Sequence, residues 1–183
     1  MADALREVTS ADGTERFILF YGPSPFLSNF HPSPFELNGV HFQNGEQYFQ
    51  YKKAEHFEDE NMQAAIQRAT TPGEQKELGR RVQNYDQDEW ERVSYEHMKA
   101  GLRAKFGQNE DLRKKLLATE NSVLVEASPR DRKWGVGLGV FNDKALDRRN
   151  WRGRNWLGQA LMEVREELRS SEHTDADTNS AKS

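Results

Sequence analysis

One segment organises the chain: Gly45-Glu46-Gln47-Tyr48-Phe49-Gln50-Tyr51-Lys52-Lys53-Ala54-Glu55-His56-Phe57. Asn44 precedes it and can cap a helix by accepting a hydrogen bond from a free backbone N–H group. Helical periodicity then places Glu46, Gln50 and Lys53 on one face. We therefore expect a helix over residues 45–57 that presents a carboxylate, an amide and an amine in successive turns.

The other faces of this helix carry Tyr48, Phe49 and Tyr51. Aromatic side chains bury large areas, so they favour a helix that is packed into a core. Polar groups on such a helix either satisfy one another or line a polar cavity. The alternative is a solvated stripe in which Glu46 and Lys53 stand too far apart to interact. The spacing alone leaves both interpretations open.

Composition bounds the class of protein. The chain has 183 residues, which is enough for one domain with its own core. Its mean hydropathy is low, −0.97, and 10 Phe, 5 Tyr and 4 Trp residues offset this in part. Cysteine is absent, which excludes disulfides, a thiol nucleophile and cysteine-based metal sites. We find no long apolar run and no signal-peptide pattern, so we expect a soluble, intracellular protein, cytoplasmic or nuclear, without membrane partners.

Charge is unevenly placed along the chain. The net charge is −4, and acidic residues gather near both ends. Residues 130–154 instead carry eight Lys or Arg residues against three Asp. This local excess predicts an anion site for phosphates or a nucleic-acid backbone, although a solvated loop would show the same count.

The element pattern predicts a mainly α-helical protein with a few short β-strands, in a single domain over residues 16–168. We expect a flexible N-terminus over 1–15 and a disordered acidic tail over 169–183. The predicted strands are 17–21 and 123–126, and Asn38-Gly39 predicts a type I′ hairpin over 35–42. Further helices are expected over 59–70, 73–82, 86–106, 110–118 and 156–168.

Other chemistries lack a sequence signal. The five histidines show no ligand spacing, so we expect no metal site. The glycines of residues 135–139 are not followed by a helix signal, which argues against a dinucleotide fold. We expect no cofactor.

A second cluster follows the strand that ends at Glu126. Asp131, Trp134 and Gly135 place a carboxylate beside an indole ring, on a loop where a ligand can approach the backbone. The alternative is an ordinary turn with Trp134 in the core.

Glu46 and Asp131 together suggest glycosidic chemistry. Such cleavage uses paired carboxylates, one to protonate the leaving group and one to support the cationic sugar or the water. A partly buried Lys53 offers a third route, because it can lose its proton and attack a sugar C1 as a Schiff-base nucleophile.

Several motifs then carry a family resemblance. Residues 46–53 resemble the pattern E-H-Y-F-Q-x-x-K, and Leu27-Ser28-Asn29-Phe30 before them is similar too. Further matching motifs follow in the family's order: Leu78-Gly79-Arg80, Trp90, Leu102–Phe106, Leu124–Glu126, Asp131–Gly137 and Gly153–Gly158. Together they resemble the NADAR superfamily (NAD- and ADP-ribose-associated proteins), which includes the YbiA-like N-glycosidases. The resemblance spans about residues 17–168.

The resemblance implies a YbiA-like fold and hydrolysis of an N-glycosidic bond at a ribose C1. Carried over by position, it implies catalytic roles for Glu46, Lys53 and Asp131. The substrate-binding residues that it implies are Tyr21, Ser28, Asn29, Gln50, Arg80, Trp90, Trp134, Gly135 and Asn155. The chain departs from the family pattern at Gln47, where His is usual, and in the longer, more basic loop over residues 138–152.

The function that we expect is removal of ADP-ribose from guanine bases, with an ADP-ribosylated guanine nucleotide or DNA as substrate and ADP-ribose as product. Two alternatives remain. One is an N-glycosidase of phosphoribosylamino-pyrimidine intermediates of riboflavin biosynthesis. The other is a non-catalytic module that binds ADP-ribose or NAD.

Overall fold

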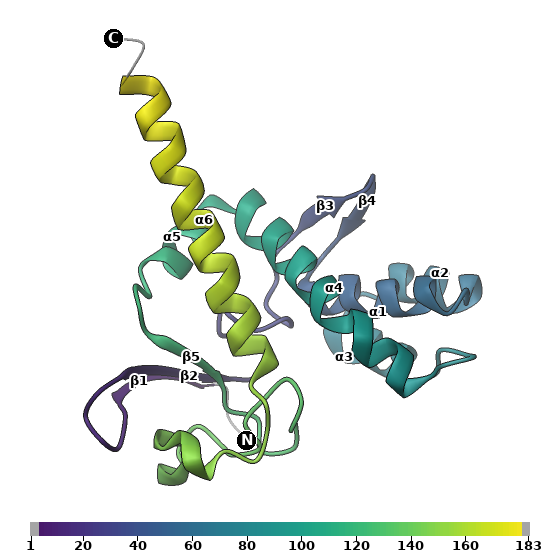
Figure 1. The fold of residues 1–183 in the computed structure, drawn as a ribbon. Helices are drawn as coiled ribbons and strands as arrows, with labels where there is room; N and C mark the ends of the chain where they lie inside the picture. The colour runs from purple at the N-terminus through teal and green to yellow at the C-terminus, as the bar shows by residue number, and fades with distance from the viewer. Residues whose placement is uncertain (1–3, 181–183) are drawn as a thin grey trace. The chain divides into compact units, whose positions relative to one another are not determined.

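The structure, a computed structural model, describes the backbone of residues 4–180 and the side chains of residues 4–171 (Figure 1). The chain forms two compact units. The first consists of residues 22–109, and the second of residues 4–21 together with the chain from Glu110 onward. The secondary structure is mainly helical with short strands, as the sequence predicted.

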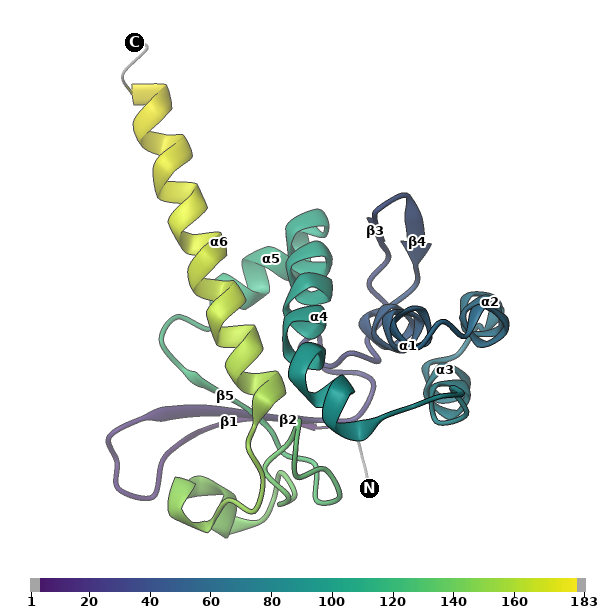
Figure 2. The same cartoon turned by 45° about the vertical axis from the view of Figure 1, so that its right-hand side comes forward.

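The first unit is built around helix α1 (Gly45–His56). It contacts helices α2 (Glu60–Arg68), α3 (Pro72–Gly79) and α4 (Gln87–Gln108). Figure 2 looks nearly along α1, α2 and α3, and it shows α1 between α4 and the other two helices. The four helices begin at capping side chains that accept backbone N–H groups, namely Asn44, Asp59, Thr71 and Asp86. The predicted helix over residues 45–57 is confirmed.

A β-hairpin completes this unit. Strands β3 (Phe35–Leu37) and β4 (Val40–Phe42) pair antiparallel. Asn38 and Gly39 have φ angles of 53° and 78°, the left-handed values that a type I′ turn needs. The hairpin packs Phe35 and Phe42 onto Tyr48 of α1, with ring centroids 5.2–5.8 Å apart. This confirms the predicted hairpin and the core-facing side of α1.

The second unit contains a three-stranded sheet in the order β1–β2–β5. Strand β2 (Arg16–Tyr21) lies between β1 (Ala4–Thr9), which is antiparallel to it, and β5 (Val123–Glu126), which is parallel. Helix α6 (Trp156–Ser180) starts beside β5 and then runs away from the sheet (Figure 1). Helix α5 (Glu110–Leu117) packs against α6. Two short 3₁₀ helices, η1 (Asp143–Leu146) and η2 (Arg148–Asn150), lie between β5 and α6 in the chain.

The structure corrects the predicted flexible N-terminus. Residues 4–9, which we expected to be flexible, form β1 and pair with β2 from Ala4 opposite Tyr21 to Thr9 opposite Arg16. Only Ala4 and Val8 pack their apolar side chains on the core of this unit, while Leu5 is 42% exposed. Burial alternates along β1, but its half-buried face carries Arg6 and its exposed face carries Leu5, so the sequence shows no apolar–polar alternation.

The structure also extends the last helix. We predicted an end near Leu168 and a disordered tail beyond it, whereas α6 continues to Ser180. No Gly or Pro follows Gly158 within the helix, so nothing in the sequence forces it to stop. Residues 181–183 of the predicted tail lie outside the described residues.

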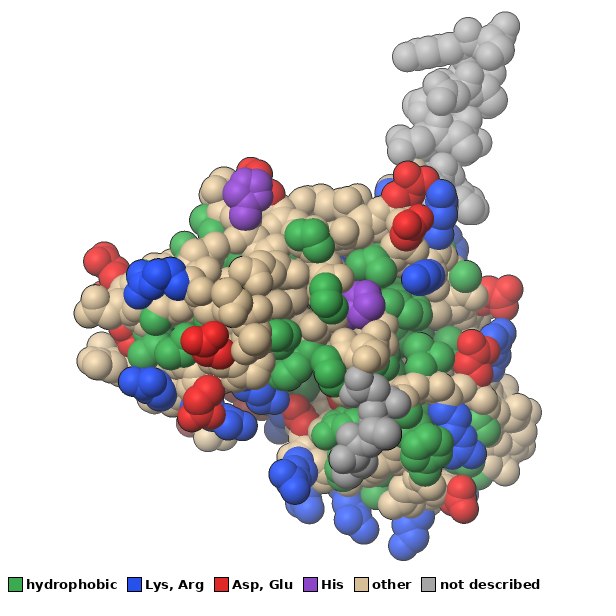
Figure 3. Space-filling model, turned by 180° about the vertical axis from the view of Figure 1, so that it is seen from behind, with side chains coloured by type: hydrophobic (Ala, Val, Ile, Leu, Met, Phe, Trp, Pro, Cys, Tyr) green, Lys and Arg blue, Asp and Glu red, His purple; other side chains and the backbone are tan. Residues whose placement is uncertain are grey.

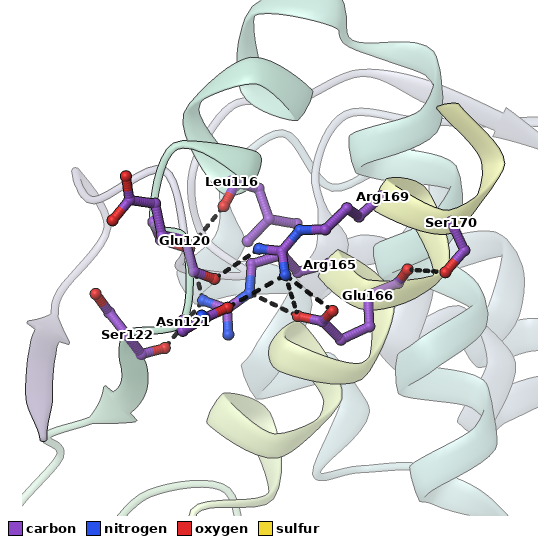
Figure 4. A network of polar contacts seen from close by, with 9 residues as sticks. Leu116, Glu120, Asn121, Ser122, Arg165, Glu166, Arg169 and Ser170 are labelled. Carbon is purple, nitrogen blue, oxygen red and sulfur yellow. Dashed lines mark hydrogen bonds and ion pairs between the residues drawn. The ribbon is translucent and has the colours of Figure 1, made fainter. Parts of the chain in front are cut away.

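Two arginines fasten α6 to the turn before β5 (Figure 4). Arg165 is 3% exposed and donates to Thr119 Oγ1 at 2.8 Å and to the Ser122 carbonyl oxygen at 2.9 Å. Arg169 donates to the Glu120 carbonyl oxygen at 2.8 Å and pairs with Glu166. Arg165 thus supplies donors to the buried Thr119 hydroxyl and Ser122 carbonyl oxygen, whereas the Arg169 bonds lie at the surface.

Candidate active site

The first set of predicted site residues lies on the polar face of α1. Glu46 and Gln50 are 6% and 8% exposed, and Gln50 Nε2 donates to Glu46 Oε1 at 2.8 Å. The face is therefore buried and internally bonded, which excludes the solvated-stripe interpretation. Because an ionised carboxylate accepts strongly, this bond fixes both the orientation of the amide and the rotamer of Glu46.

Helix α3 supplies the surface against which this face packs. Gln50 Oε1 has no hydrogen-bond partner among the described residues, because it is pressed against the Cα of Gly79. A Cβ at Gly79 would lie 1.9 Å from that oxygen, so no other residue fits without displacing the amide. A weak Cα–H···O contact is the one compensation that glycine offers there.

Lys53 completes the face and is anchored by the same glycine. Its Nζ donates to the Gly79 carbonyl oxygen at 2.7 Å and lies 4.3 Å from the centroid of the Tyr85 ring. Burial lowers the pKa of Lys53, the negative charge of Glu46 partly opposes this, and the positive charge of Arg80 adds to the lowering. Burial thus raises the share of neutral amine, the form that acts as a nucleophile, above that of an exposed lysine at the same pH. Tyr85 was missed by the sequence analysis, because its contact with Lys53 depends on the turn between α3 and α4.

The loop before α1 is tied to the start of the helix. Ser28 and Asn29 are buried, and the Asn29 carbonyl oxygen accepts the Glu46 N–H at 3.0 Å. The Asn29 side chain donates to Met98 Sδ at 3.1 Å, and its Oδ1 faces Gly45. Ser28 Oγ accepts the Phe30 N–H. Asn29 thus braces the backbone of Glu46, and the Ser28 side chain braces the loop that carries Asn29.

Two further predicted residues of this unit differ in exposure. Trp90 is 4% exposed and packs in an aromatic cluster, 5.3 Å from the ring of Phe49 and stacked on His97 at 5.5 Å. Arg80 is exposed and pairs with Glu77 at 2.8 Å. Trp90 therefore supports α1 from the core, while Arg80 stands where it can meet a ligand.

The second unit holds the other predicted residues on the loop after β5. Asp131 Oδ1 accepts the backbone N–H groups of Lys133 at 2.9 Å, Trp134 at 2.7 Å and Gly135 at 3.4 Å. One carboxylate oxygen thus shapes the turn that displays the Trp134 indole. No hydrogen bond to the other oxygen, Oδ2, is found within residues 4–171.

Asn155 has a structural task in this loop. It adopts φ = 54°, is 1% exposed, and accepts the Glu126 N–H at 3.0 Å while donating to the Leu124 carbonyl oxygen at 2.8 Å. Both ends of its amide are therefore used by β5. The Asn155 amide thus supports the end of β5, and the substrate contact that the family resemblance implies for it stays a prediction.

Trp134 and Trp156 form an aromatic and cationic cluster in the same unit. Their rings meet edge to face at 5.7 Å, and the Trp156 ring lies 4.9 Å from Lys133 Nζ and 5.2 Å from the Arg154 guanidinium. Such surfaces stack with nucleobases and attract phosphates. Gly135 is buried under this turn, and Tyr21 ends β2 in the half-buried layer of the sheet.

Part of the basic segment is neutralised within the fold. Arg148 pairs with Glu15 through two bonds of 2.6 and 2.9 Å, and Arg149 pairs with Asp147 at 2.7 Å. In Figure 3, Lys and Arg side chains still gather along the lower edge of the face, the end where η1 and η2 lie in Figure 1. The count of positive charges in the sequence therefore overstates the field available to an anion.

The structure brings the predicted residues together in two sets. One set is Ser28, Asn29, Glu46, Gln50, Lys53, Arg80 and Trp90, and the other is Tyr21, Asp131, Trp134, Gly135 and Asn155. Within the described residues, no three His, Asp or Glu side chains are grouped to hold a metal ion. None of the described helices is long and apolar enough to cross a bilayer.

Comparison with known proteins places this arrangement in a family of enzymes. A model of the NADAR domain matches residues 19–169, and the chain belongs to the NADAR family. It is 34% identical over 165 residues to N-glycosidase R617 of Acanthamoeba polyphaga mimivirus, covering 84% of this chain and 97% of that protein. It is 40% identical over 175 residues to Protein irg-1 of Caenorhabditis elegans, covering 87% and 82%.

A solved structure is also similar. The NMR structure of the Escherichia coli protein YbiA matches with a TM-score of 0.70 and 34% identity, over 85% of this chain and 86% of that one. The mainly helical fold with short strands is therefore the YbiA fold, as the sequence motifs implied.

Proposed function

We propose that this chain hydrolyses the N-glycosidic bond between ADP-ribose and a guanine base. Membership of a family with relatives named N-glycosidases supports the class of reaction. The observation that carries the proposal is the polar face of α1, where a buried carboxylate, Glu46, is held by Gln50 one turn before Lys53. A carboxyl group for proton transfer and an amine with a lowered pKa are what cleavage through an imine requires.

The proposed reaction begins with neutral Lys53 and protonated Glu46, the pair that results when the Lys53 ammonium group passes a proton to the Glu46 carboxylate. The Lys53 lone pair forms a bond to ribose C1 while the bond from C1 to the guanine nitrogen breaks, and Glu46 delivers a proton to that nitrogen. The sugar ring then opens as the ring oxygen takes a proton from the Lys53 nitrogen, which leaves a protonated imine between C1 and Lys53. Water then adds to C1, Glu46 takes up a proton, and Lys53 leaves as ADP-ribose is released. A direct route omits the imine, with Glu46 activating water against a cationic C1.

The remaining residues position these groups. Gln50 and the Asn29 backbone hold Glu46. The Gly79 carbonyl oxygen holds the Lys53 amine until a bound substrate replaces this hydrogen bond. We propose that Asp131 orients ribose hydroxyl groups through Oδ2 and that Trp134 stacks on the base. Arg80 is proposed to contact the pyrophosphate.

One observation favours a smaller substrate. Pairing of Arg148 with Glu15 and of Arg149 with Asp147 removes part of the positive excess that a polyanion would need. The second candidate function is therefore cleavage of a phosphoribosylamino-pyrimidine, which carries one phosphate. The catalytic face would be the same, and the substrates alone would differ.

The test is a comparison of substrates with the unmodified protein. We expect release of ADP-ribose from a guanine-ADP-ribosylated oligonucleotide, with kcat/KM at least tenfold above that for a phosphoribosylamino-pyrimidine. The reverse order of the two kcat/KM values would support the second candidate function, cleavage of a phosphoribosylamino-pyrimidine. Tight binding of ADP-ribose with no turnover of either substrate would make it a binding module.

Borohydride reduction separates the two routes of cleavage. The imine route predicts a reduced sugar adduct whose mass is found on the peptide that contains Lys53. Turnover without any adduct under conditions that trap a control imine enzyme would favour the direct route.

A further inference from the structure

One buried cation of the first unit is not used by the proposed chemistry. Lys105 of α4 is 0% exposed, and its Nζ donates to the carbonyl oxygens of Phe26 at 2.7 Å and Ser28 at 2.8 Å. The Phe106 ring centroid lies 5.0 Å from Nζ. No carboxylate pairs with Lys105 in the described part of the chain. A buried ammonium group without a counter-ion is costly, so its presence calls for an explanation.

The environment of Lys105 makes it titrate near neutrality. Burial lowers its pKa to about 7, because the charged form loses its hydration in the interior. Desolvation is the sole cause of this shift, and the elements packed around Nζ present backbone carbonyl groups and an aromatic ring rather than charges. The ionisation of Lys105 therefore changes the strength of two hydrogen bonds to one loop.

That loop leads directly to the catalytic face. Asn29 follows Ser28 and accepts the backbone N–H of Glu46 at 3.0 Å. The Asn29 side chain also closes on Gly45, where a Cβ would lie 2.8 Å from Oδ1. A shift of the carbonyl groups held by Lys105 would thus move the first turn of α1 and the Glu46 carboxylate with it.

We propose that Lys105 is a positioning residue that holds the Phe26–Asn29 loop and thereby fixes Glu46 for proton transfer. This inference rests on the N-glycosidase function proposed above. Charged donors form the stronger hydrogen bonds, so the protonated amine holds the loop more firmly than the neutral one. Protonation also places an unhydrated charge in the interior. The protonated form of Lys105 therefore holds the loop more firmly but lowers the free energy of unfolding.

The two effects give opposite pH trends. The pKa of Lys105 is about 7 in the folded chain, against 10.5 for an exposed lysine, so the unfolded chain binds the extra proton between these values. Its contribution to stability is then complete above pH 10.5 and is lost as the pH falls to about 7. The value of kcat should instead fall as the pH rises through 7. If Lys105 had only a structural role, the free energy of unfolding would still increase as the pH rises, but kcat would not fall with it.

The first experiment compares Lys105→Met with Lys115→Met, a control at an exposed lysine of α5. We expect kcat of Lys105→Met to fall about 10- to 100-fold, as small misplacements of catalytic groups do, while KM changes little. The alkaline fall of kcat should also disappear. Lys115→Met should keep both the wild-type kcat and its pH profile. Wild-type kcat with an intact alkaline fall in Lys105→Met would overturn the proposal.

The second experiment needs neither a variant nor a substrate. In the unmodified protein labelled with ¹⁵N and with ¹³C-lysine, the Lys105 side-chain signal should titrate near pH 7. The Glu46 amide signal should follow with the same midpoint. Titration of Lys105 near pH 10.5, or a Glu46 amide that does not move with it, would contradict the coupling. Coupled titration without cleavage of any glycoside would defeat the proposed function and leave the positioning role supported.

Discussion

Gly79 serves the candidate site with both its backbone carbonyl group and its missing side chain. Its oxygen accepts the Lys53 amine, and its Cα gives Gln50 room to reach Glu46. A single residue of α3 thus sets the positions of two groups on α1. Glycine is required there for close approach and not for backbone conformation, because its φ angle is not positive.

Gly79→Ala should therefore damage the site. The new methyl group would displace the Gln50 amide and break its bond to Glu46. We expect kcat/KM to fall about tenfold or more, with a loss of about 1–3 kcal/mol in the free energy of unfolding. Gly73→Ala is the matched control, because α3 offers open space at that position. Equal activity of the two variants would show that the Gln50 contact is dispensable.

The pH dependence of the reaction should report on Lys53. The neutral amine is the reactive form, so kcat/KM should rise with pH through the pKa of Lys53, which burial lowers. The inflection should lie below the pKa of an exposed lysine. A pH–rate profile from about pH 5 upward measures it in Lys105→Met, in which the alkaline fall expected from Lys105 is absent. A rate that falls there as Lys53 deprotonates would exclude the amine as nucleophile.

The sequence showed which residues share the polar face of α1 but not which groups contact them in the fold. Spacing predicted the alignment of Glu46, Gln50 and Lys53, whereas the contacts of Gly79 and Tyr85 come from other elements. Gln47, where the family usually has His, is fully buried and donates to the carbonyl oxygens of Ile66, Gln67 and Ala69 while it accepts the Gln43 N–H. The departure at this position is therefore structural, because the amide ties α1 to the end of α2.

At the scale of elements, α6 depends on its polar attachment to the turn before β5 (Figure 4). Arg165 is buried, and burial lowers its pKa. Its charge is offset by Glu166, whose Oε1 lies 3.5 Å from Nε, and by its hydrogen bonds to Thr119 and Ser122. Arg169 makes its bonds closer to solvent. The two arginines therefore differ in how much stability their loss should cost.

Arg165→Met should lower the free energy of unfolding by about 2–4 kcal/mol, because Thr119 and Ser122 would be left buried without donors. Arg169→Met should cost about 1 kcal/mol or less, as for other exposed ion pairs. Urea unfolding of both variants measures the difference. Equal losses would mean that the buried arginine contributes no more than the exposed one.

Elements with strong local signals were predictable, and elements defined by tertiary contacts were not. Capping residues and apolar periodicity predicted the helices, and Asn38-Gly39 predicted the hairpin. Strand β1 escaped prediction because its partner β2 supplies the register. The end of α6 was placed too early because the loss of apolar residues was taken as the end of the helix, although the chain after Gly158 contains no helix breaker.

At the scale of the whole molecule, a count of charges along the sequence does not show which charges are paired in the fold. The sequence shows a basic segment over residues 130–154, but Glu15 lies far away in the chain and neutralises Arg148. The residues of that segment around Trp134 and Trp156 retain the mixed aromatic and cationic character. Electrostatic attraction of a substrate to this unit should accordingly rest on the residues near the indoles.

One NADAR domain spans both compact units, over residues 19–169. The family motifs predicted this extent and the residues of both sets. Residue types and spacing do not reveal whether a polar or aromatic residue contacts a ligand or supports a neighbouring element. Asn155 and Trp90, for example, are both buried in the fold. That distinction depends on which hydrogen bonds are already made within the fold.

The central claim is that the α1 face performs the cleavage of an N-glycosidic bond. The most direct measurement is the rate of ADP-ribose release from a guanine-ADP-ribosylated oligonucleotide by Glu46→Gln, Lys53→Met and the control Lys52→Met. Lys52 is the neighbour of Lys53 on the same helix and pairs with Glu55. We expect kcat to fall by about 10³-fold or more in the first two variants and to stay near wild type in the control. Near-wild-type release by Glu46→Gln and Lys53→Met would contradict the claim and place the chemistry elsewhere in the chain.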